Sequence, residues 1–528
     1  LAFPMPKVLI SDKMSDLAAE VFQRRGIEVD VKTGLSPEEL CAIIGDYDGL
    51  AVRSSTKVRG PVFDAATNLK VVGRAGIGVD NVDMDAATAK GVVVMNTPFG
   101  NSITTAEHAI AMLMSLARDI PQANASTHAG KWEKSRFMGV EITGKVLGII
   151  GCGNIGSVVA DRAQGLKMRV IAFDPYLTED RAKDLGVEKV TLDDLLARAD
   201  FISLHTPLTD ATRHVVDAEA LAKTRKGVRL INCARGGLVD EKALKDALDS
   251  GHVAGAAIDV FEEEPATDNA LFGMEQVICT PHLGASTAEA QEKVAVQIAE
   301  QISDYLLDGA VANALNMPSV TAEEAPRLKP YMALANQLGS FAGQATRSAI
   351  REVTISYEGV CGELNCKPLT AVVLQGLLGP TVEGVNMVNA PIIAKQRDVV
   401  VREVRSDNAG SFQTRIQVSV TTEDQTRSIS GTLVHDLPRL TDIKGISIDA
   451  SLGRHLLYIT NYDKPGLVGA LGSLLGNAGI NIAAFNFGRS EPGGDSIALL
   501  EVDEAPPPSV VSEIQALENV VLVQVMRF

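Results

Sequence analysis

The chain has 528 residues, enough for several domains of ordinary size. Hydrophobic residues make up 46% and charged residues 22%, a composition that excludes a wholly disordered chain. The formal net charge of −17 disfavours binding to nucleic acid or to an anionic membrane surface. No apolar run approaches the roughly 18 residues of a membrane-spanning helix. Six cysteines without a CxxC pair indicate a reducing compartment, with neither disulfides nor a metal site.

The first hundred residues alternate short apolar strands with amphipathic helices. Ser36, followed by Pro37 and Glu39, is typical of a helix N-terminus. Residues 1–4 are left out of the fold prediction, and no basic and apolar leader suggests secretion, so we expect a cytoplasmic protein. The alternation predicts a mostly parallel sheet. We expect its strands at residues 7–11, 49–53, 70–74 and 92–96.

A helix predicted over 102–117 leads into a second series of alternating strands and helices. Its strands are expected at residues 145–150, 170–174, 200–204, 227–232, 254–259 and 276–280. A long helix is predicted over 285–308. We therefore predict a two-lobed, Rossmann-like α/β block of doubly wound parallel sheets. The first lobe comprises residues 5–100 and is completed by 285–318, and the second comprises residues 101–284.

The character of the sequence changes at residue 319. Strand-like alternation at 413–420 and 428–434 predicts an α+β domain over residues 319–452. The last segment, 453–528, shows the order βαββαβ, which is typical of a ferredoxin-like fold.

A glycine-rich loop follows the strand at 145–150 and opens a helix. Its GxGxxG pattern comprises Gly151, Gly153, Asn154, Ile155 and Gly156. Glycines there let the backbone approach a pyrophosphate at a helix N-terminus. Asp174 ends the next strand, where a carboxylate accepts hydrogen bonds from ribose hydroxyls and repels a 2′-phosphate. The pattern predicts a site for NAD rather than NADP.

Three polar segments follow strands of the same lobe, at 232–240, 259–265 and 280–287. Ligands gather at such strand ends. Hydride transfer from an alcohol carbon needs a base, for which histidine is suited, a carboxylate behind it, and an arginine for a substrate carboxylate. Of eight histidines, His205 is the main competitor to His282 because it also follows a strand.

These segments carry a family resemblance, together with the motifs at 71–83, 96–102 and 151–156. The sequence resembles the D-isomer-specific 2-hydroxyacid dehydrogenases, and among them the long-form D-3-phosphoglycerate dehydrogenases, over essentially its whole length. The resemblance implies that Arg235 binds the substrate carboxylate and that His282 is the acid and base. It pairs His282 with Glu264, the only one of three successive glutamates at the motif position.

The resemblance also implies a set of cofactor and substrate contacts. Those lining NAD are Ile77, Thr206, Cys233, Ala234 and Asp259, with Asp259 bonded to the carboxamide. The contacts expected on the substrate side are Arg53 and Arg74 for a phosphate, with Gly76, Asn101 and Ser102 beside them. Whether Lys134 or Arg136 adds charge from a neighbouring subunit stays open.

The ferredoxin-like end resembles the ACT domain, an amino-acid-sensing module. The resemblance implies that Asn461, Asp463 and Asn481 clasp an amino acid, with L-serine the usual effector, between two copies of the module. The alternative is that Asp463 caps the following helix and Asn481 occupies a turn. An unpaired sheet edge favours a homodimer or homotetramer.

The expected reaction is the oxidation of 3-phospho-D-glycerate by NAD⁺ to 3-phosphohydroxypyruvate, the entry to serine biosynthesis, under control by L-serine. One rival is a glyoxylate, hydroxypyruvate or lactate-type dehydrogenase, which needs the same three residues. Other rivals are a non-catalytic NAD-sensing protein and an amino-acid-binding regulator without catalysis.

Overall fold

The computed structural model describes residues 5–98, 100–321 and 323–528. Residues 1–4, and Phe99 of the 96–102 motif, lie outside the described residues. The chain forms two compact units, which are described separately. Unit 1 contains the chain up to Arg74, Gly78–Asn96 and Ile298–Phe528, and unit 2 contains Ala75–Ile77 and Thr97–Gln297.

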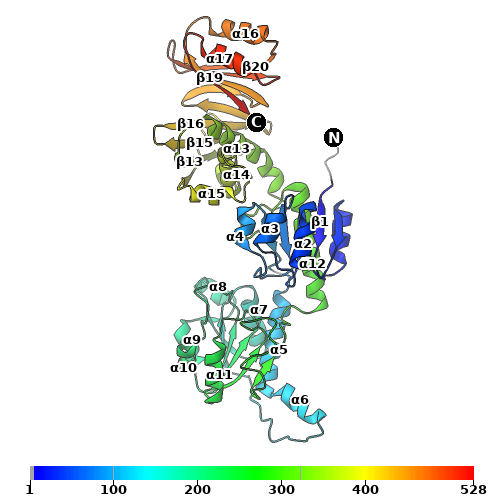
Figure 1. The fold of residues 1–528 in the computed structure, drawn as a ribbon. Coiled ribbons are helices and arrows are strands. Elements are labelled where there is room, and N and C mark those ends of the chain that lie inside the picture. Colours follow the sequence, from blue (N-terminus) through cyan, green and yellow to red (C-terminus); the bar gives the residue numbers. More distant parts are fainter. Residues whose placement is uncertain (1–4, 99, 322) are drawn as a thin grey trace. The chain divides into compact units, whose positions relative to one another are not determined.

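The N-terminal part of unit 1 is a five-stranded parallel sheet in the order β2-β1-β3-β4-β5 (Figure 1). The strands are β1 (Lys7–Ile10), β2 (Glu28–Val31), β3 (Gly49–Val52), β4 (Val71–Arg74) and β5 (Val93–Asn96). The helices are α1 (Leu17–Arg24), α2 (Pro37–Ile43), α3 (Gly60–Ala65) and α4 (Met84–Ala89), with a 3-10 turn η1 (Ile44–Asp46). Ser36 and Glu39 form the predicted capping box of α2.

The C-terminal half of helix α12 (Ala288–Asp308) packs on this sheet. A Cβ added to Gly73 would lie 2.5 Å from Ile302 Cδ1, so the helix packs directly on β4. The helix begins three residues later than predicted, because Thr287 Oγ1 accepts a hydrogen bond from the Ala290 amide and leaves 285–287 in the preceding loop.

Unit 2 holds a seven-stranded, all-parallel sheet in the order β12-β11-β10-β9-β6-β7-β8. The strands are β6 (Val146–Ile150), β7 (Arg169–Phe173), β8 (Glu188–Lys189), β9 (Phe201–Leu204), β10 (Val228–Asn232), β11 (Val253–Ile258) and β12 (Val277–Cys279). The helices are α5 (Ser102–Arg118), α6 (Ile120–His128), α7 (Asn154–Gly165), α8 (Glu179–Asp184), α9 (Leu192–Arg198), α10 (Ala218–Lys223) and α11 (Glu241–Asp249). The sheet has two apolar clusters, one including α5 and α7 and the other α9, α10 and α11.

The remainder of unit 1 begins with a six-stranded mixed sheet in the order β14-β13-β15-β16-β17-β18. Its strands are β13 (Ile350–Gly359), β14 (Val400–Ser406), β15 (Thr414–Thr422), β16 (Thr426–Val434), β17 (Leu437–Ile443) and β18 (Ile446–Ala450). Its helices are α13 (Ala325–Ala345), α14 (Cys366–Leu378) and α15 (Ala390–Gln396), with a 3-10 turn η2 (Val360–Glu363). Helices α13 and α14 share one hydrophobic core with the sheet.

The C-terminal sheet has the order β20-β21-β19-β22, which confirms the ferredoxin-like prediction. Its strands are β19 (His455–Tyr462), β20 (Ile482–Arg489), β21 (Asp495–Val502) and β22 (Val520–Arg527), and its helices are α16 (Leu467–Asn477) and α17 (Pro508–Gln515). No helix in the described ranges is both long and apolar enough to cross a bilayer.

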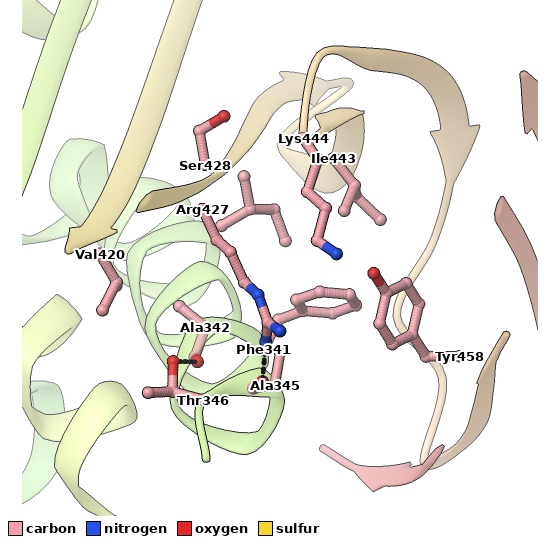
Figure 2. A pocket seen from close by; sticks show the side chains of 11 residues that line it. Phe341, Ala342, Ala345, Thr346, Val420, Arg427, Ser428, Ile443, Lys444 and Tyr458 are labelled. Atoms are coloured by element: carbon pink, nitrogen blue, oxygen red, sulfur yellow. Dashed lines mark hydrogen bonds between the residues drawn. The ribbon is translucent and has the colours of Figure 1, made fainter. Parts of the chain in front are cut away.

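A cavity of about 310 Å³, its open mouth included, lies where these two parts of unit 1 meet. Figure 2 shows the side chains of Arg427 and Lys444 reaching toward it, with Phe341 and Tyr458 beside them. Burial and the neighbouring Arg427 lower the pKa of Lys444. The rings of Phe341 and Tyr458 meet edge to face at 5.2 Å, so the two parts are packed together here.

Candidate active site

His282 and Glu264 form a hydrogen-bonded pair in unit 2. The His282 Nδ1–H donates to Glu264 Oε2 across 2.7 Å, and the other oxygen of Glu264 accepts from the Phe261 amide at 3.1 Å. The His282 backbone has a φ of +55°, an uncommon conformation for a residue with a side chain. Burial opposes ionisation of Glu264, but the hydrogen bond and charge of His282 outweigh it, and the pKa of Glu264 is lowered. An ionised Glu264 therefore fixes the ring and leaves Nε2 for proton transfer.

Asp259 anchors the loop that carries His282. Its side chain is fully buried after β11 and accepts hydrogen bonds from the Thr280 hydroxyl at 2.6 Å and from the amides of Leu283 and Gly284 at 2.7 and 2.9 Å. The Asp259 carbonyl also accepts from the His282 amide. Burial opposes the charge, but bonds from His108, Thr280 and Leu283 lower the pKa of Asp259.

Arg235 follows β10, three residues after Asn232. Asn232 holds the turn, because its side chain donates to the Arg235 carbonyl at 2.9 Å and accepts from the Ala234 amide at 3.1 Å. The Arg235 guanidinium donates to the Ala234 carbonyl at 2.6 Å and is half-buried. Gly236 has no room for a side chain, since a Cβ there would lie 1.7 Å from the Phe261 carbonyl oxygen. The close approach ties the Arg235 turn to the segment that contains Glu264.

The glycine-rich loop has the geometry that a dinucleotide requires. Gly151 has a φ of +91°, and a Cβ on Gly156 would lie 2.0 Å from the Gly151 carbonyl oxygen, so neither position tolerates a side chain. Helix α7 begins immediately after Gly153, with Asn154 and Ile155 in its first turn. This helix N-terminus offers free amides to a phosphate.

Asp174 is held beside the same loop. One carboxylate oxygen accepts from the Cys152 amide at 2.9 Å and the other from the Tyr176 amide at 2.8 Å. Each oxygen keeps a further lone pair for a ribose hydroxyl. Thr206 follows β9, and its hydroxyl is buried without a hydrogen-bond partner in the part of the chain that the structure describes. An orphaned donor beside a glycine loop fits a bound dinucleotide.

The other predicted contacts of unit 2 fall into three groups. Cys233 and Ala234 are buried at the end of β10. The Gly76 amide donates to the Thr97 hydroxyl at 2.7 Å, one residue before Ile77. Asn101 and Ser102 begin α5 and are buried, and Asn101 Oδ1 has no hydrogen-bond partner among the residues described.

The competing histidine is unsuited to catalysis. His205 is enclosed, its Nε2 lies 2.8 Å from the Ser203 hydroxyl, and burial lowers its pKa to about 4.

Sequence reasoning missed His108, a histidine near the proposed site. His108 on α5 places its Nε2 3.3 Å from Asp259 Oδ1, and no local spacing joins a helix residue to a strand end so distant in sequence.

The chain is similar over nearly its whole length to known enzymes. It is 44% identical over 525 residues to the D-3-phosphoglycerate dehydrogenase of Bacillus subtilis, covering 99% of each chain. It is 42% identical over 518 residues to the enzyme of that name from Methanocaldococcus jannaschii, covering 98% of each. The chain belongs to the D-3-phosphoglycerate dehydrogenase family.

Family profiles match three segments of the present chain, a member of the phosphoglycerate dehydrogenase family. They are the NAD binding domain of D-isomer specific 2-hydroxyacid dehydrogenases over residues 110–284, the D-3-phosphoglycerate dehydrogenase intervening domain over 327–444, and the ACT domain over 455–519. The resemblance, the fold class and the NAD-dependent dehydrogenase class predicted from the sequence are thereby confirmed.

Solved structures of the wider 2-hydroxyacid dehydrogenase family match a smaller share of this chain. A glyoxylate reductase from Paecilomyes thermophila is 29% identical, with a TM-score of 0.55, and the match covers 59% of this chain and 99% of that one. The apo D-lactate dehydrogenase of Escherichia coli is 29% identical, with a TM-score of 0.53, and the match covers 59% of this chain and all of that one. About two fifths of this chain therefore lie outside these matches.

The predicted phosphate ligands of this phosphoglycerate dehydrogenase family member lie in unit 1. Arg53 follows β3, and Asp12 holds it by accepting from its amide at 2.6 Å, while the Arg53 guanidinium donates to the Lys13 carbonyl at 3.1 Å. Arg74 ends β4. In unit 2, Arg136 is engaged with Glu133 and Glu275, whereas Lys134 is exposed.

The predicted effector residues of the ACT domain each have a different partner. Asn461 donates to the Tyr462 carbonyl at 3.0 Å, and its buried Oδ1 has no partner within the described ranges. Asp463 accepts from Arg489 at 3.0 Å and from the Gly493 amide, and these bonds lower its pKa. Asn481 donates to Asp503 at 2.9 Å. Gly466, not Asp463, is the N-cap of α16, so Asp463 does not cap that helix.

Proposed function

We propose that the protein oxidises 3-phospho-D-glycerate to 3-phosphohydroxypyruvate with NAD⁺, the first step of L-serine biosynthesis. The observation that carries the proposal is the 2.7 Å pair of His282 and Glu264 beside the Arg235 turn, within a chain that aligns end to end with D-3-phosphoglycerate dehydrogenases. The alignment covers the intervening and ACT segments, which supports this substrate over glyoxylate or lactate.

The proposed proton transfer uses His282. Its Nε2 accepts the proton of the substrate hydroxyl as the hydride leaves the same carbon, and Glu264 stabilises the resulting imidazolium. Arg235 binds the substrate carboxylate through its planar guanidinium. Exclusion of water around the reacting carbon favours the transfer.

The proposed cofactor site is the strand-end edge of unit 2. The loop amides at Gly153, Asn154, Ile155 and Gly156 hold the pyrophosphate, Gly151 supplies the turn that brings them close, and Asp174 holds the adenosine ribose. The residues assigned to the rest of the dinucleotide are Ile77, Thr206, Cys233, Ala234 and Asp259. When bound, NAD⁺ supplies the hydride acceptor.

The proposed substrate contacts are the residues that the family resemblance implies. Arg53 and Arg74 counter the charge of the substrate phosphate, which the acidic chain otherwise repels. Gly76, Asn101 and Ser102 are the polar residues proposed near the carboxylate, to which the side-chain amide of Asn101 offers its N–H donors.

The proposed regulation is binding of L-serine by the ACT domain through Asn461, Asp463 and Asn481. The unpartnered Oδ1 of Asn461 is an acceptor for the serine ammonium, and the ionised Asp463 adds negative charge. We further propose a cytoplasmic homodimer or homotetramer. The proposed domain limits are 5–100 with 285–318, 101–284, 319–452 and 453–528.

The test follows NADH absorbance while the full chain reduces 3-phosphohydroxypyruvate, hydroxypyruvate or glyoxylate, each with and without L-serine. We expect a clear preference for the phosphorylated substrate and a change of rate with serine. The Arg53→Ala variant should lose that preference while keeping reduction of hydroxypyruvate.

Two results would contradict the proposal. Preference for an unphosphorylated acid would assign the chain to the glyoxylate or lactate type. Binding of NADH without turnover of any substrate would indicate an NAD-sensing protein instead.

A further inference from the structure

Three side chains with metal-ligating atoms converge inside unit 2. They are His108 on α5, Cys233 after β10 and Asp259 after β11, and their ligand atoms all lie within 4.8 Å of one another. Cys233 and Asp259 are buried, and the His108 side chain is 19% exposed. The proposed hydride transfer assigns no metal to these residues and no role to His108.

The donor types match one class of ion. A thiolate, an imidazole and a carboxylate are the ligands that Zn²⁺ takes in proteins, at about 2.0–2.3 Å. A tetrahedral ion with such bonds places its ligand atoms roughly 3.5 Å apart. His108 Nε2 and Asp259 Oδ1 are 3.3 Å apart, close to that spacing, and the Cys233 Sγ lies within 4.8 Å of a ligand atom of each.

Charge balance favours a divalent ion at this position. A dication with one thiolate and one carboxylate is neutral overall, which a buried site requires. Asp259 Oδ1 accepts from Thr280 and Leu283, whereas Oδ2 accepts from the Gly284 amide and keeps a second lone pair for an ion. The Thr280 hydroxyl donates to Asp259 Oδ1 across 2.6 Å and lies 3.5 Å from His108 Nε2, so it is a hydrogen-bond partner of these ligands and not a ligand itself.

We propose that His108, Cys233 and Asp259 bind one zinc-class divalent ion, and that this ion competes with the nicotinamide end of the cofactor. Binding breaks the S–H bond of Cys233 and forms a metal–sulfur bond, and the proton leaves to solvent. His108 binds through Nε2, which gives up its hydrogen bond to Asp259, and its ring proton moves to Nδ1. No atom is oxidised or reduced.

The competition with cofactor rests on the proposed function, which places Cys233 and Asp259 along NAD. A metal ion bonded to both occupies their polar atoms. It also competes with the Thr280, Leu283 and Gly284 donors that hold the loop of His282 on Asp259. The ion therefore acts as an inhibitor and not as a cofactor.

The test is a titration of the full chain with Co²⁺, which reports a thiolate ligand by its charge-transfer absorption. We expect one equivalent to bind with that band. Cys233→Ala should abolish the band, and His108→Leu should weaken Co²⁺ binding at least tenfold. The matched controls Cys279→Ala and His128→Leu, which alter an exposed thiol and an exposed imidazole, should leave the titration unchanged.

A second measurement needs no variant. X-ray absorption of the Zn²⁺-loaded wild-type chain should show one sulfur and otherwise nitrogen or oxygen ligands, and a shell without sulfur would overturn the proposal. A cobalt band that survives Cys233→Ala would also overturn it.

Addition of NADH should raise the Co²⁺ concentration needed for half-saturation. Metal binding that NADH leaves unchanged would overturn the competition but keep the ion site. Failure of the enzyme to act on phosphoglycerate would leave the cobalt band intact, so the two proposals fail separately.

Discussion

The Glu264 carboxylate stabilises whatever positive charge His282 acquires during the reaction. Glu264→Gln keeps the size of the side chain but removes its charge, so we expect kcat/KM to fall on the order of 100-fold. Reduction of phosphohydroxypyruvate requires the imidazolium. Without its counter-charge that cation is less stable in the transition state, so reduction should also slow.

The control is Glu263→Gln at the neighbouring position, which does not contact His282. Steady-state kcat/KM values of both variants, measured across pH, show whether the loss of activity is specific to Glu264. Equal losses in the two variants would remove Glu264 from the proposed mechanism.

His205 makes a separate, pH-dependent contribution to stability. The pKa of His205 is about 4 in the folded chain, below the ordinary value of 6.5. Between pH 4 and pH 6.5, therefore, His205 is protonated in the unfolded chain but neutral in the native chain. The free energy of unfolding should therefore fall as pH drops from 6.5 toward 4, by about 3 kcal/mol for this group. Above pH 6.5 the group has no effect.

Calorimetric Tm values at pH 7.5 and 5.0 test this. The drop should be smaller in His205→Gln than in the wild type, and unchanged in the exposed control His128→Gln. An equal drop in both variants would assign the acid sensitivity to other groups.

At the scale of elements, the turn between β17 and β18 carries Lys444, an exposed residue whose side chain lines the cavity of Figure 2. Lys444 faces Arg427 across the cavity of Figure 2, and burial lowers its pKa. Lys444→Met retains the aliphatic stem and removes the repulsion, so we expect Tm to rise by roughly 2 °C. Lys464→Met, at an exposed loop position, should leave Tm unchanged, and a lower Tm for Lys444→Met would show that the ammonium is stabilising.

Helices and strands whose apolar residues recur at a regular spacing were predictable from the sequence, and elements without such a spacing were not. Helix α14 is buried on almost every side, so its apolar run has no face that distinguishes a helix from a strand. Strand β14 is an exposed edge without alternation, and only its parallel pairing with β13 makes it a strand. Residues at strand ends, such as Arg235 and His282, follow from local motifs. The contact of His108 with Asp259 depends on how α5 packs, which no motif records.

At the scale of the whole molecule, the two proposed ligands bind different units. NAD⁺ should stabilise unit 2 and L-serine should stabilise unit 1, which contains the ACT segment. At a concentration 100 times Kd each contributes about 2.7 kcal/mol to the folded state. We expect calorimetry of the full chain to show two transitions that the two ligands shift separately.

NADP⁺ and D-serine are the matched control ligands and should shift neither transition. A single transition that both NAD⁺ and L-serine raise equally would show that the units unfold together. A serine shift confined to the transition raised by NAD⁺ would contradict the ACT assignment.

The packing of Ile302 on Gly73 has a consequence for the order of events on the ribosome. The first sheet emerges early, but the helix residues that cover its β4 side are made only after residues 97–297. Translation at roughly 5–20 residues per second leaves that apolar side bare for about 10–40 s. Unit 2 is nearly continuous in the chain. It can therefore finish folding before the C-terminal half of α12 is synthesised and packs on the N-terminal sheet.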